Sequence, residues 1–215
     1  MLVRDRMTKH PLTIDVDTSL SAVHTYMEEQ HVRHLPVVDK TGKLVGLVTE
    51  GDLLKAGPSS VTSLSVWEIH SLLDRITVRN VMVHDVITTV EDIPIEDAAH
   101  VMLDHKISCL PVLREGRLVG IITEVDIFRT FMEMFAGRQK GLRITMEVLD
   151  REGELAKVAQ AIANQGGYIA ACGVFMSADP AKWGLVFKVR NVDRDVLIAA
   201  LSEIEGQKIL DVREV

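Results

Sequence analysis

Residues 35–38 read Leu-Pro-Val-Val and residues 46–52 read Gly-Leu-Val-Thr-Glu-Gly-Asp. Both segments recur, as Leu-Pro-Val-Leu at 110–113 and Gly-Ile-Ile-Thr-Glu-Val-Asp at 120–126. A repeat of this length indicates two copies of one supersecondary unit, each too small to bury its apolar face alone. The sequence therefore predicts two similar motifs that stack on one another.

Each copy is expected to contain the same series of elements. A short strand (12–16 and 87–90) leads to a helix (20–30 and 95–105) whose apolar residues recur at helical spacing. Asp17 and Asp92 precede these helices and are expected to cap them, and Pro94 suits a first helical turn. A hairpin across a glycine turn follows, and a last helix begins after Thr49 or Thr123. The hairpin strands are predicted at 35–38, 44–49, 110–113 and 118–123.

The composition indicates a globular protein and excludes several functions. Of the 215 residues, 47% are hydrophobic and 26% are charged, and the formal net charge is -7. Such acidity argues against general nucleic-acid binding, which needs a basic face. No apolar run approaches the length of a membrane span, and no signal peptide is expected. Cys109 and Cys172 lie in apolar sequence and are expected to be buried thiols in a cytoplasmic protein.

The spacing Thr-x-x-Asp lies at a predicted strand-to-helix junction in both copies. If Thr49 caps the helix, Asp52 is its third residue, and the same holds for Thr123 and Asp126. One interpretation is a capping box that stabilises each helix. The other is a nucleotide site, in which the threonine hydroxyl and the helix N-terminus bind phosphate and the aspartate accepts from both ribose hydroxyls. Gly46 and Gly120 lack a Cβ and are expected to let a ligand approach the backbone. Repetition favours the nucleotide site.

The quoted segments, in this order and in both copies, resemble the CBS motif, and the tandem pair resembles a Bateman module over roughly residues 1–135. This resemblance implies an adenine nucleotide bound in clefts between the motifs, with no required cofactor. The adenine is expected against the start of the first strand, and the residues before Leu-Pro are expected to line the same cleft. The implied binding residues are Thr13, Ile14, Ile87, Thr88, Arg33, His34, Pro36, Pro111, Thr49, Asp52, Thr123, Asp126 and Arg129.

The two clefts are predicted to be unequal. Arg33 can pair with a phosphate, whereas its counterpart Ser108 can donate only one hydroxyl hydrogen bond. The side with Arg33 and His34 is therefore the expected polyphosphate binder. Arg33 and His34 can also be interpreted as a solvated surface pair. Arg129 and its counterpart Lys55, three residues after each aspartate, are further candidates for phosphate contact.

The pattern changes after a short stretch of glycine and charged residues. Residues 142–148 alternate apolar and polar, 155–165 form an amphipathic helix that ends at Gly166, and strands are expected at 168–176 and 183–189. A second helix at 193–205 and a strand at 208–212 complete a βαββαβ order, which is that of a ferredoxin-like unit.

The first loop and helix of this unit resemble the ACT domain. In that family an amino-acid effector binds at this loop, which implies the effector residues Asp150, Glu152, Gly153, Glu154 and Leu155. Pro-Gly is usual where Glu152 and Gly153 stand, which leaves two alternatives: amino-acid binding, or a pairing role without ligand. ACT-like sheets often assemble edge to edge, and CBS pairs often form disc-like dimers, so a homodimer or larger assembly is expected.

The whole architecture resembles the acetoin utilisation protein B family. The predicted fold class is α+β, with mixed α/β character: two CBS motifs packed as a pseudo-symmetric pair, then the ferredoxin-like domain. The domains are expected at 1–57 (first CBS motif), 58–77 (connecting helix), 78–135 (second CBS motif), 136–141 (linker) and 142–215 (ACT-like domain).

Three functions from different classes follow for this chain. The first is a regulatory nucleotide sensor that modulates an unknown metabolic partner without membrane or nucleic-acid contact, and the second is a dimerisation scaffold with empty clefts. The third is an enzyme, for which no catalytic constellation is found. No metal site is expected either, since His31-x-x-His34 runs directly into a predicted strand.

Overall fold

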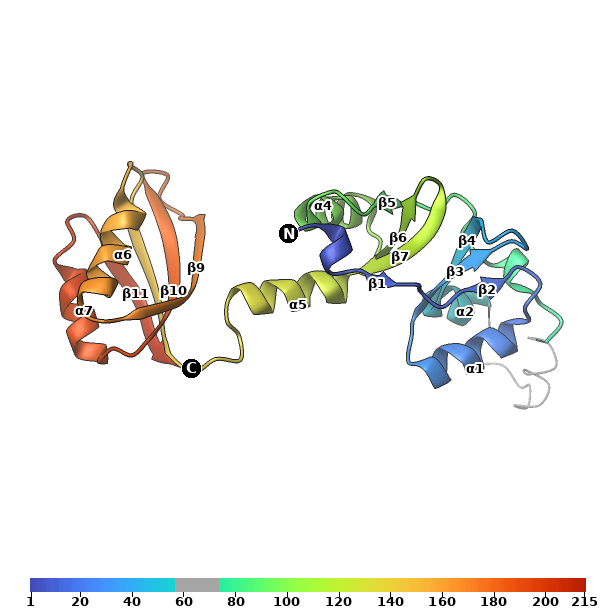
Figure 1. The fold of residues 1–215 in the computed structure, drawn as a ribbon, viewed down its shortest axis with the longest axis horizontal. Helices are drawn as coiled ribbons and strands as arrows, with labels where there is room; N and C mark the ends of the chain where they lie inside the picture. The colour runs from blue at the N-terminus through green and yellow to red at the C-terminus, as the bar shows by residue number, and fades with distance from the viewer. Residues whose placement is uncertain (57–73) are drawn as a thin grey trace. The chain divides into compact units, whose positions relative to one another are not determined.

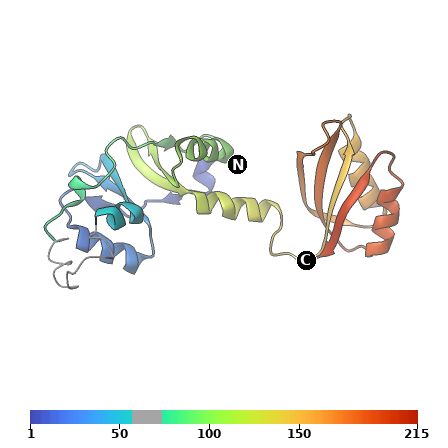
Figure 2. The same cartoon turned by 180° about the vertical axis from the view of Figure 1, so that it is seen from behind.

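The computed structural model describes residues 1–56 and 74–215, so most of the predicted connecting helix lies outside the described residues. The chain forms two compact units, Met1–Ile127 and Phe128–Val215. Figures 1 and 2 show both units from opposite sides. Each unit is described by itself.

The first unit contains the predicted repeat of elements (Figure 1). In the first copy these are β2 (Ile14–Asp15), α1 (Leu20–Gln30), β3 (His34–Val38), β4 (Leu44–Thr49) and α2 (Glu50–Ala56). In the second they are β5 (Thr89–Val90), α4 (Ile95–His105), β6 (Cys109–Arg114), β7 (Arg117–Thr123) and α5 (Glu124–Met134). The helix α5 begins in the first unit and continues past Ile127 into the second. A short 3-10 helix leads each copy, η1 (Val3–Asp5) and η2 (Val78–Asn80), and β1 (Thr8–Lys9) follows η1. The first strands are shorter than predicted, whereas α1 and α4 have the predicted bounds.

The predicted helix caps are wrong. Ser19 caps α1 by accepting a hydrogen bond from the Ala22 amide at 3.3 Å, and Pro94 occupies the N-cap of α4 without a side-chain bond. The two aspartates instead form ion pairs with the segment that leads the other copy. Asp17 accepts from Arg79 at 2.8 Å, and Asp92 pairs with Arg4.

These ion pairs belong to an exchange of leading segments between the two motifs. The Val3 amide donates to the Ile93 carbonyl at 3.0 Å, and β1 pairs antiparallel with β7. Reciprocally, the Val78 amide donates to the Thr18 carbonyl at 2.9 Å, and Val83 bridges to Leu47. The first motif therefore needs residues 78–83 to complete its sheet, and the second needs residues 3–9.

The exchanged segments also complete the hydrophobic cores. Val78 and Met82 are buried with α1, β3 and β4, while Val3 and Met7 are buried with α4, β6 and β7. Burying a methionine of this kind contributes about 1.5–3 kcal/mol. The two motifs are therefore interdependent for stability.

The second unit has the predicted βαββαβ order. Its elements are β8 (Leu142–Leu149), α6 (Glu154–Asn164), β9 (Tyr168–Met176), β10 (Lys182–Arg190), α7 (Arg194–Ser202) and β11 (Lys208–Glu214). The sheet is antiparallel with the order β11-β8-β10-β9. Both helices cover one face (Figures 1 and 2), and α7 is shorter than predicted because Asp193 is its N-cap and Ser202 its last residue.

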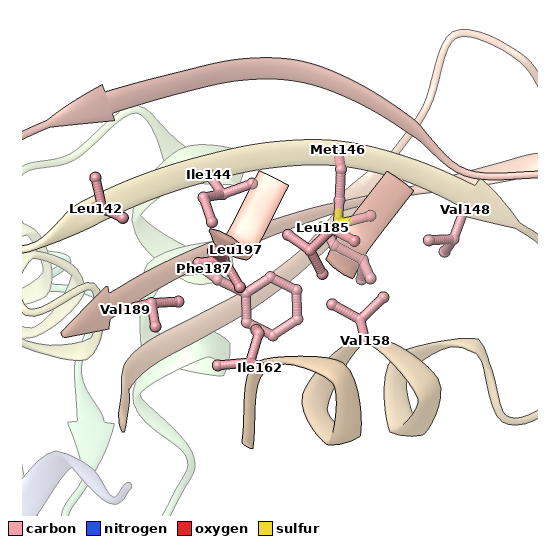
Figure 3. Close-up of a cluster of buried hydrophobic side chains, with 11 residues drawn as sticks. Leu142, Ile144, Met146, Val148, Val158, Ile162, Leu185, Phe187, Val189 and Leu197 are labelled. Atoms are coloured by element: carbon pink, nitrogen blue, oxygen red, sulfur yellow. The ribbon is translucent and has the colours of Figure 1, made fainter. Parts of the chain in front are cut away.

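The core of this unit follows the alternation of β8. Leu142, Ile144, Met146 and Val148 point to the helices and are buried (Figure 3). They pack against β10 and the apolar faces of α6 and α7, with Phe187 and Ile162 facing each other at the centre (Figure 3). On the opposite face, buried Lys188 donates from Nζ to the Ala136 carbonyl at 2.8 Å. Ala136, the first residue of the predicted linker, is thereby attached to the sheet.

Candidate functional site

The Thr-x-x-Asp segments form complete capping boxes in both motifs. The Thr49 amide and hydroxyl both donate to Oδ2 of Asp52, at 3.0 and 2.7 Å, and the Asp52 amide donates back to Oγ1 at 3.3 Å. In the second motif the corresponding distances between Thr123 and Asp126 are 2.9, 2.7 and 3.4 Å. The local geometry is therefore duplicated, and all four side chains are half-buried at a strand-to-helix junction.

The glycines of this segment serve packing. A Cβ on Gly46 would lie 2.4 Å from the sulfur of Met82, and one on Gly120 would lie 2.4 Å from the sulfur of Met7. The carbonyls of Val83 and Thr8 are close to the same positions. The role predicted for Gly46 and Gly120, access of a ligand to the backbone, is corrected: their missing side chains admit the exchanged methionines.

The proline of each Leu-Pro segment is buried within a strand. Pro36 lies opposite Leu47 in the β3–β4 hairpin, and parallel pairing with β2 begins only one residue later, between Ile14 and Val37. Pro111 occupies the same position between β7 and β5. Proline cannot donate a backbone hydrogen bond, so the first strand separates from its neighbour at this point. The chain before Ile14 is therefore not paired with the chain before Pro36.

The predicted adenine-contact residues differ in exposure. Thr13, Ile87 and Thr88 are half-buried, whereas Ile14 is buried in the core of the first motif. Arg33 is 79% exposed in its side chain and lies 3.5 Å from the Glu50 carboxylate. Arg129 and Lys55 lie exposed on α5 and α2. The cations proposed to contact phosphate are thus at the surface.

His34 connects the two motifs. It begins β3, lies opposite Thr49, and its Nε2 is 2.8 Å from the hydroxyl of Ser108 in the second motif. Burial lowers the pKa of His34 from its ordinary value, and the nearby Glu124 carboxylate opposes this effect. Glu124 is the first residue of α5, next to Thr123. The segment before Leu-Pro of the first motif therefore lies near the Thr-x-x-Asp segment of the second.

Cys109, in the second motif, lies near the Thr-x-x-Asp segment of the first motif. Burial raises the pKa of its thiol to about 12, and the carboxylates of Asp52 and Glu124 add to the effect. Asp52 belongs to the first motif and Cys109 to the second. The sequence predicted clefts between the motifs, but it did not predict which residues of one motif lie near which residues of the other, because no local pattern encodes that proximity.

Side-chain hydrogen bonds within the second unit hold the predicted effector loop in place. Asp150 accepts from the Trp183 indole at 2.7 Å, and Gly153 adopts a left-handed conformation with φ +84° before α6. Oε1 of the buried Glu154 accepts from Lys157 at 2.7 Å and from Arg151 at 2.5 Å. These two bonds lower the pKa of Glu154. Glu152 and Leu155 are exposed at the same loop.

Three cavities are lined by none of the predicted binding or effector residues. One of about 560 Å³ lies beside Arg79 and Met82, and one of about 270 Å³ lies beside their repeat counterparts Arg4 and Met7. A third, of about 700 Å³, lies in the second unit around Arg190. Within residues 1–56 and 74–215, no group of three potential metal ligands is found. Across these same residues, no helix has the length and apolar character to cross a membrane.

Two interlocked repeats with duplicated Thr-x-x-Asp helix starts define a tandem CBS pair. The CBS domain family model matches residues 3–59 and 78–133, just over half of the chain, so the chain belongs to the CBS domain family.

Among curated relatives, the L-aspartate semialdehyde sulfurtransferase of Methanocaldococcus jannaschii is 34% identical over 131 residues. The match covers 60% of this chain but only 23% of that enzyme, and this chain thus spans about a quarter of the first relatives' length.

Three solved structures resemble the chain. The CBS pair of the protein MJ0100, in complex with 5′-methylthioadenosine and S-adenosyl-L-methionine, is 32% identical, with a TM-score of 0.52, and covers 65% of this chain and 98% of its own. A Vibrio cholerae protein proposed to act in acetoin utilization is 34% identical, with the same TM-score and coverage. CBSX2 in complex with AMP is 28% identical, with a TM-score of 0.50, over 61% of this chain and 96% of its own.

Proposed function

We propose that this chain is a non-catalytic regulatory protein that binds an adenine nucleotide, or another adenosyl ligand, between its two CBS motifs. The observation that carries the proposal is the duplicated Thr-x-x-Asp geometry, in which both threonine donors converge on one carboxylate oxygen. A carboxylate accepts about four hydrogen bonds in all, more than the two that each threonine donates, which is compatible with acceptance from ribose hydroxyls. The adenosyl ligands of MJ0100 and CBSX2 support the same ligand class.

Each cleft is proposed to combine both motifs. Thr13, Arg33 and His34 would act with Thr123 and Asp126, because His34 lies near Glu124. Ile87, Thr88 and Ser108 would act with Thr49 and Asp52, because Cys109 lies near Asp52. The first cleft carries the exposed Arg33 and is proposed to prefer phosphorylated ligands. No cofactor is part of this proposal, and the similarity to the Vibrio cholerae protein supports a role in acetoin utilisation with a protein partner still to be identified.

Titration calorimetry with AMP, ADP, ATP, S-adenosylmethionine and 5′-methylthioadenosine tests this function. At least one of these ligands is expected to bind with a dissociation constant well below millimolar. Absence of binding at millimolar concentration would support the alternative, a dimerisation scaffold without ligand. Turnover of a bound ligand would contradict the non-catalytic role.

A second candidate function is amino-acid binding by the second unit, which we propose to be ACT-like and ferredoxin-like on its element and strand order. One observation favours it: Oε2 of Glu154 is buried and accepts no hydrogen bond within the described part of the chain. The α-ammonium group of an amino acid would donate a hydrogen bond to this oxygen. The same calorimetry with the common amino acids tests this site, and a Glu154→Gln variant is expected to lose any binding that depends on the carboxylate.

The second unit is also proposed to hold two copies together. β9 lies at one edge of the sheet and carries no charged residue, and Val174, Phe175 and Met176 on it are exposed. The other edge strand, β11, carries Lys208, Asp211, Arg213 and Glu214. Charged edges resist pairing and uncharged ones favour it. Cys172, predicted to be buried, is instead exposed at the middle of β9.

Light scattering at micromolar concentration is expected to show a dimer for the wild type. Val174→Lys is expected to raise the dimer dissociation constant at least about tenfold, because it places like charges in the paired edge. Leu210→Lys on β11, where the exposed fraction is similar, is the matched control and should remain dimeric. A Val174→Lys protein as dimeric as the wild type would contradict pairing through β9.

A further inference from the structure

His34 occupies a position between the two motifs where charge, burial and a hydrogen bond meet. Its imidazole is half-buried, and Nε2 lies 2.8 Å from the Ser108 hydroxyl across the interface. The ring therefore contacts the residue that corresponds to Arg33 in the second motif. Two positions proposed to line the ligand clefts, one from each motif, are thus linked by a side-chain hydrogen bond.

Charged groups on α5, on α2 and just before β3 act on this imidazole. Glu124 at the start of α5 and Glu50 and Asp52 on α2 favour its protonation, while Arg33 on its own strand edge opposes it. Arg33 is itself 3.5 Å from Glu50. The surroundings thus contain three carboxylates and one cation. Burial nevertheless outweighs them and lowers the pKa of His34, so the free protein holds a neutral ring at neutral pH.

A neutral imidazole in such surroundings responds to an added anion. A phosphate placed beside Arg33 would occupy the guanidinium that now opposes protonation and would add negative charge of its own. Both changes favour the imidazolium, which can then donate from both ring nitrogens, one to Ser108 and one toward the ligand. A ligand that carries adenosine without phosphate brings neither change.

We propose that His34 makes binding of phosphorylated adenosyl ligands proton-linked and thereby distinguishes them from uncharged ones. The proton comes from solvent and resides on the imidazole ring; no covalent bond is formed or broken. This inference rests on the proposed function, because it concerns the same cleft. By linkage, the affinity for a phosphorylated ligand rises as the pH falls. The rise occurs between the pKa of His34 in the complex and its lower pKa in the free protein, and it amounts to at most about tenfold per pH unit. Affinity for an uncharged adenosyl ligand stays constant.

The test compares the affinities of AMP and 5′-methylthioadenosine by calorimetry at pH 6, 7 and 8. At pH 7 the titrations are repeated in two buffers of different ionisation enthalpy, which measures the number of protons taken up on binding. The wild type is expected to take up a proton with AMP and none with 5′-methylthioadenosine. His34→Gln keeps a hydrogen-bonding partner for Ser108 but cannot titrate, and it should lose the uptake. The same variant also shows how much of the proton uptake comes from the AMP phosphate itself, whose second pKa is about 6. His105→Gln, on the exposed end of α4, is the matched control and should behave as the wild type.

Three calorimetric outcomes decide the inference. Proton uptake with AMP that His34→Gln abolishes and His105→Gln retains supports it. AMP binding with the same pH dependence and proton uptake in the wild type and His34→Gln overturns it while leaving the proposed function intact. Absence of binding of both ligands at every pH overturns both. An NMR titration of the His34 ring without ligand checks the starting state, and a pKa at or above about 6.5 would overturn the premise of a neutral, buried ring.

Discussion

Asp126→Ala is expected to remove ligand from the cleft that contains Arg33 and His34, and Asp52→Ala from the cleft that contains Ser108. Each aspartate is proposed to accept from two ribose hydroxyls, and hydrogen bonds to a charged group contribute about 1.5–3 kcal/mol each. Loss of both corresponds to a weakening of about a hundredfold or more. A two-site titration of each variant measures which cleft is lost.

The capping boxes add a second effect to these variants. Asp52 and Asp126 each hold a threonine at the start of a helix, so replacement by alanine is expected to cost about 1 kcal/mol of stability through the cap alone. Asp126→Asn is the matched control, because its amide oxygen can still accept from the Thr123 amide and hydroxyl. It should restore most of the stability while binding remains weakened by loss of the charge. Unchanged ligand affinity in both alanine variants would contradict the assignment of these aspartates.

Gly46→Ala and Gly120→Ala are expected to destabilise the first unit strongly. The added Cβ would lie 2.4 Å from the sulfur of Met82 or Met7, and 3.2 or 3.1 Å from the carbonyl of the exchanged segment. Because the segment is held by backbone pairing and by its buried methionine, relief requires movement of both. Overpacking of this kind costs about 1–3 kcal/mol. Urea unfolding followed by circular dichroism measures the loss.

Gly51→Ala is the matched control for these variants. Its Cβ would meet only the Thr49 hydroxyl, at 3.6 Å, and Gly51 lies on α2, where alanine is favoured by about 0.5–1 kcal/mol. It should therefore be neutral or stabilising. In a Gly46→Ala background, Met82→Ala should cost less than it does alone, since the clash is removed with the side chain. Gly46→Ala and Gly120→Ala proteins as stable as the wild type would show that the exchanged methionines can move without cost.

Much of the secondary structure could be predicted because it depends on local patterns. The helices α1 and α4 begin and end where the spacing of apolar residues placed them, and β9 has its predicted bounds. The caps were less predictable. Ser19 and Asp17 both lie close to the start of α1, and only the position of Arg79 decides that Asp17 forms an ion pair instead.

The candidate site was predictable in part for the same reason. Thr49 and Asp52 interact across three residues of one helix start, so their hydrogen bonds follow from the sequence spacing. The roles of Gly46 and His34 do not follow from the spacing of residues in the sequence. Gly46 meets Met82, and His34 meets Ser108, in each case a residue far along the chain.

By itself the sequence determined the repeat, its strands and helices, the paired Thr-x-x-Asp helix starts and the element order of the second unit, because each depends on residues close together in the chain. Only the tertiary structure decided that the motifs exchange their leading segments, that glycines admit methionines from the other motif, and that His34 and Ser108 meet between them. Those contacts are set by how two pseudo-symmetric surfaces pack, and packing partners distant in the chain leave no periodic pattern in the residues that form them.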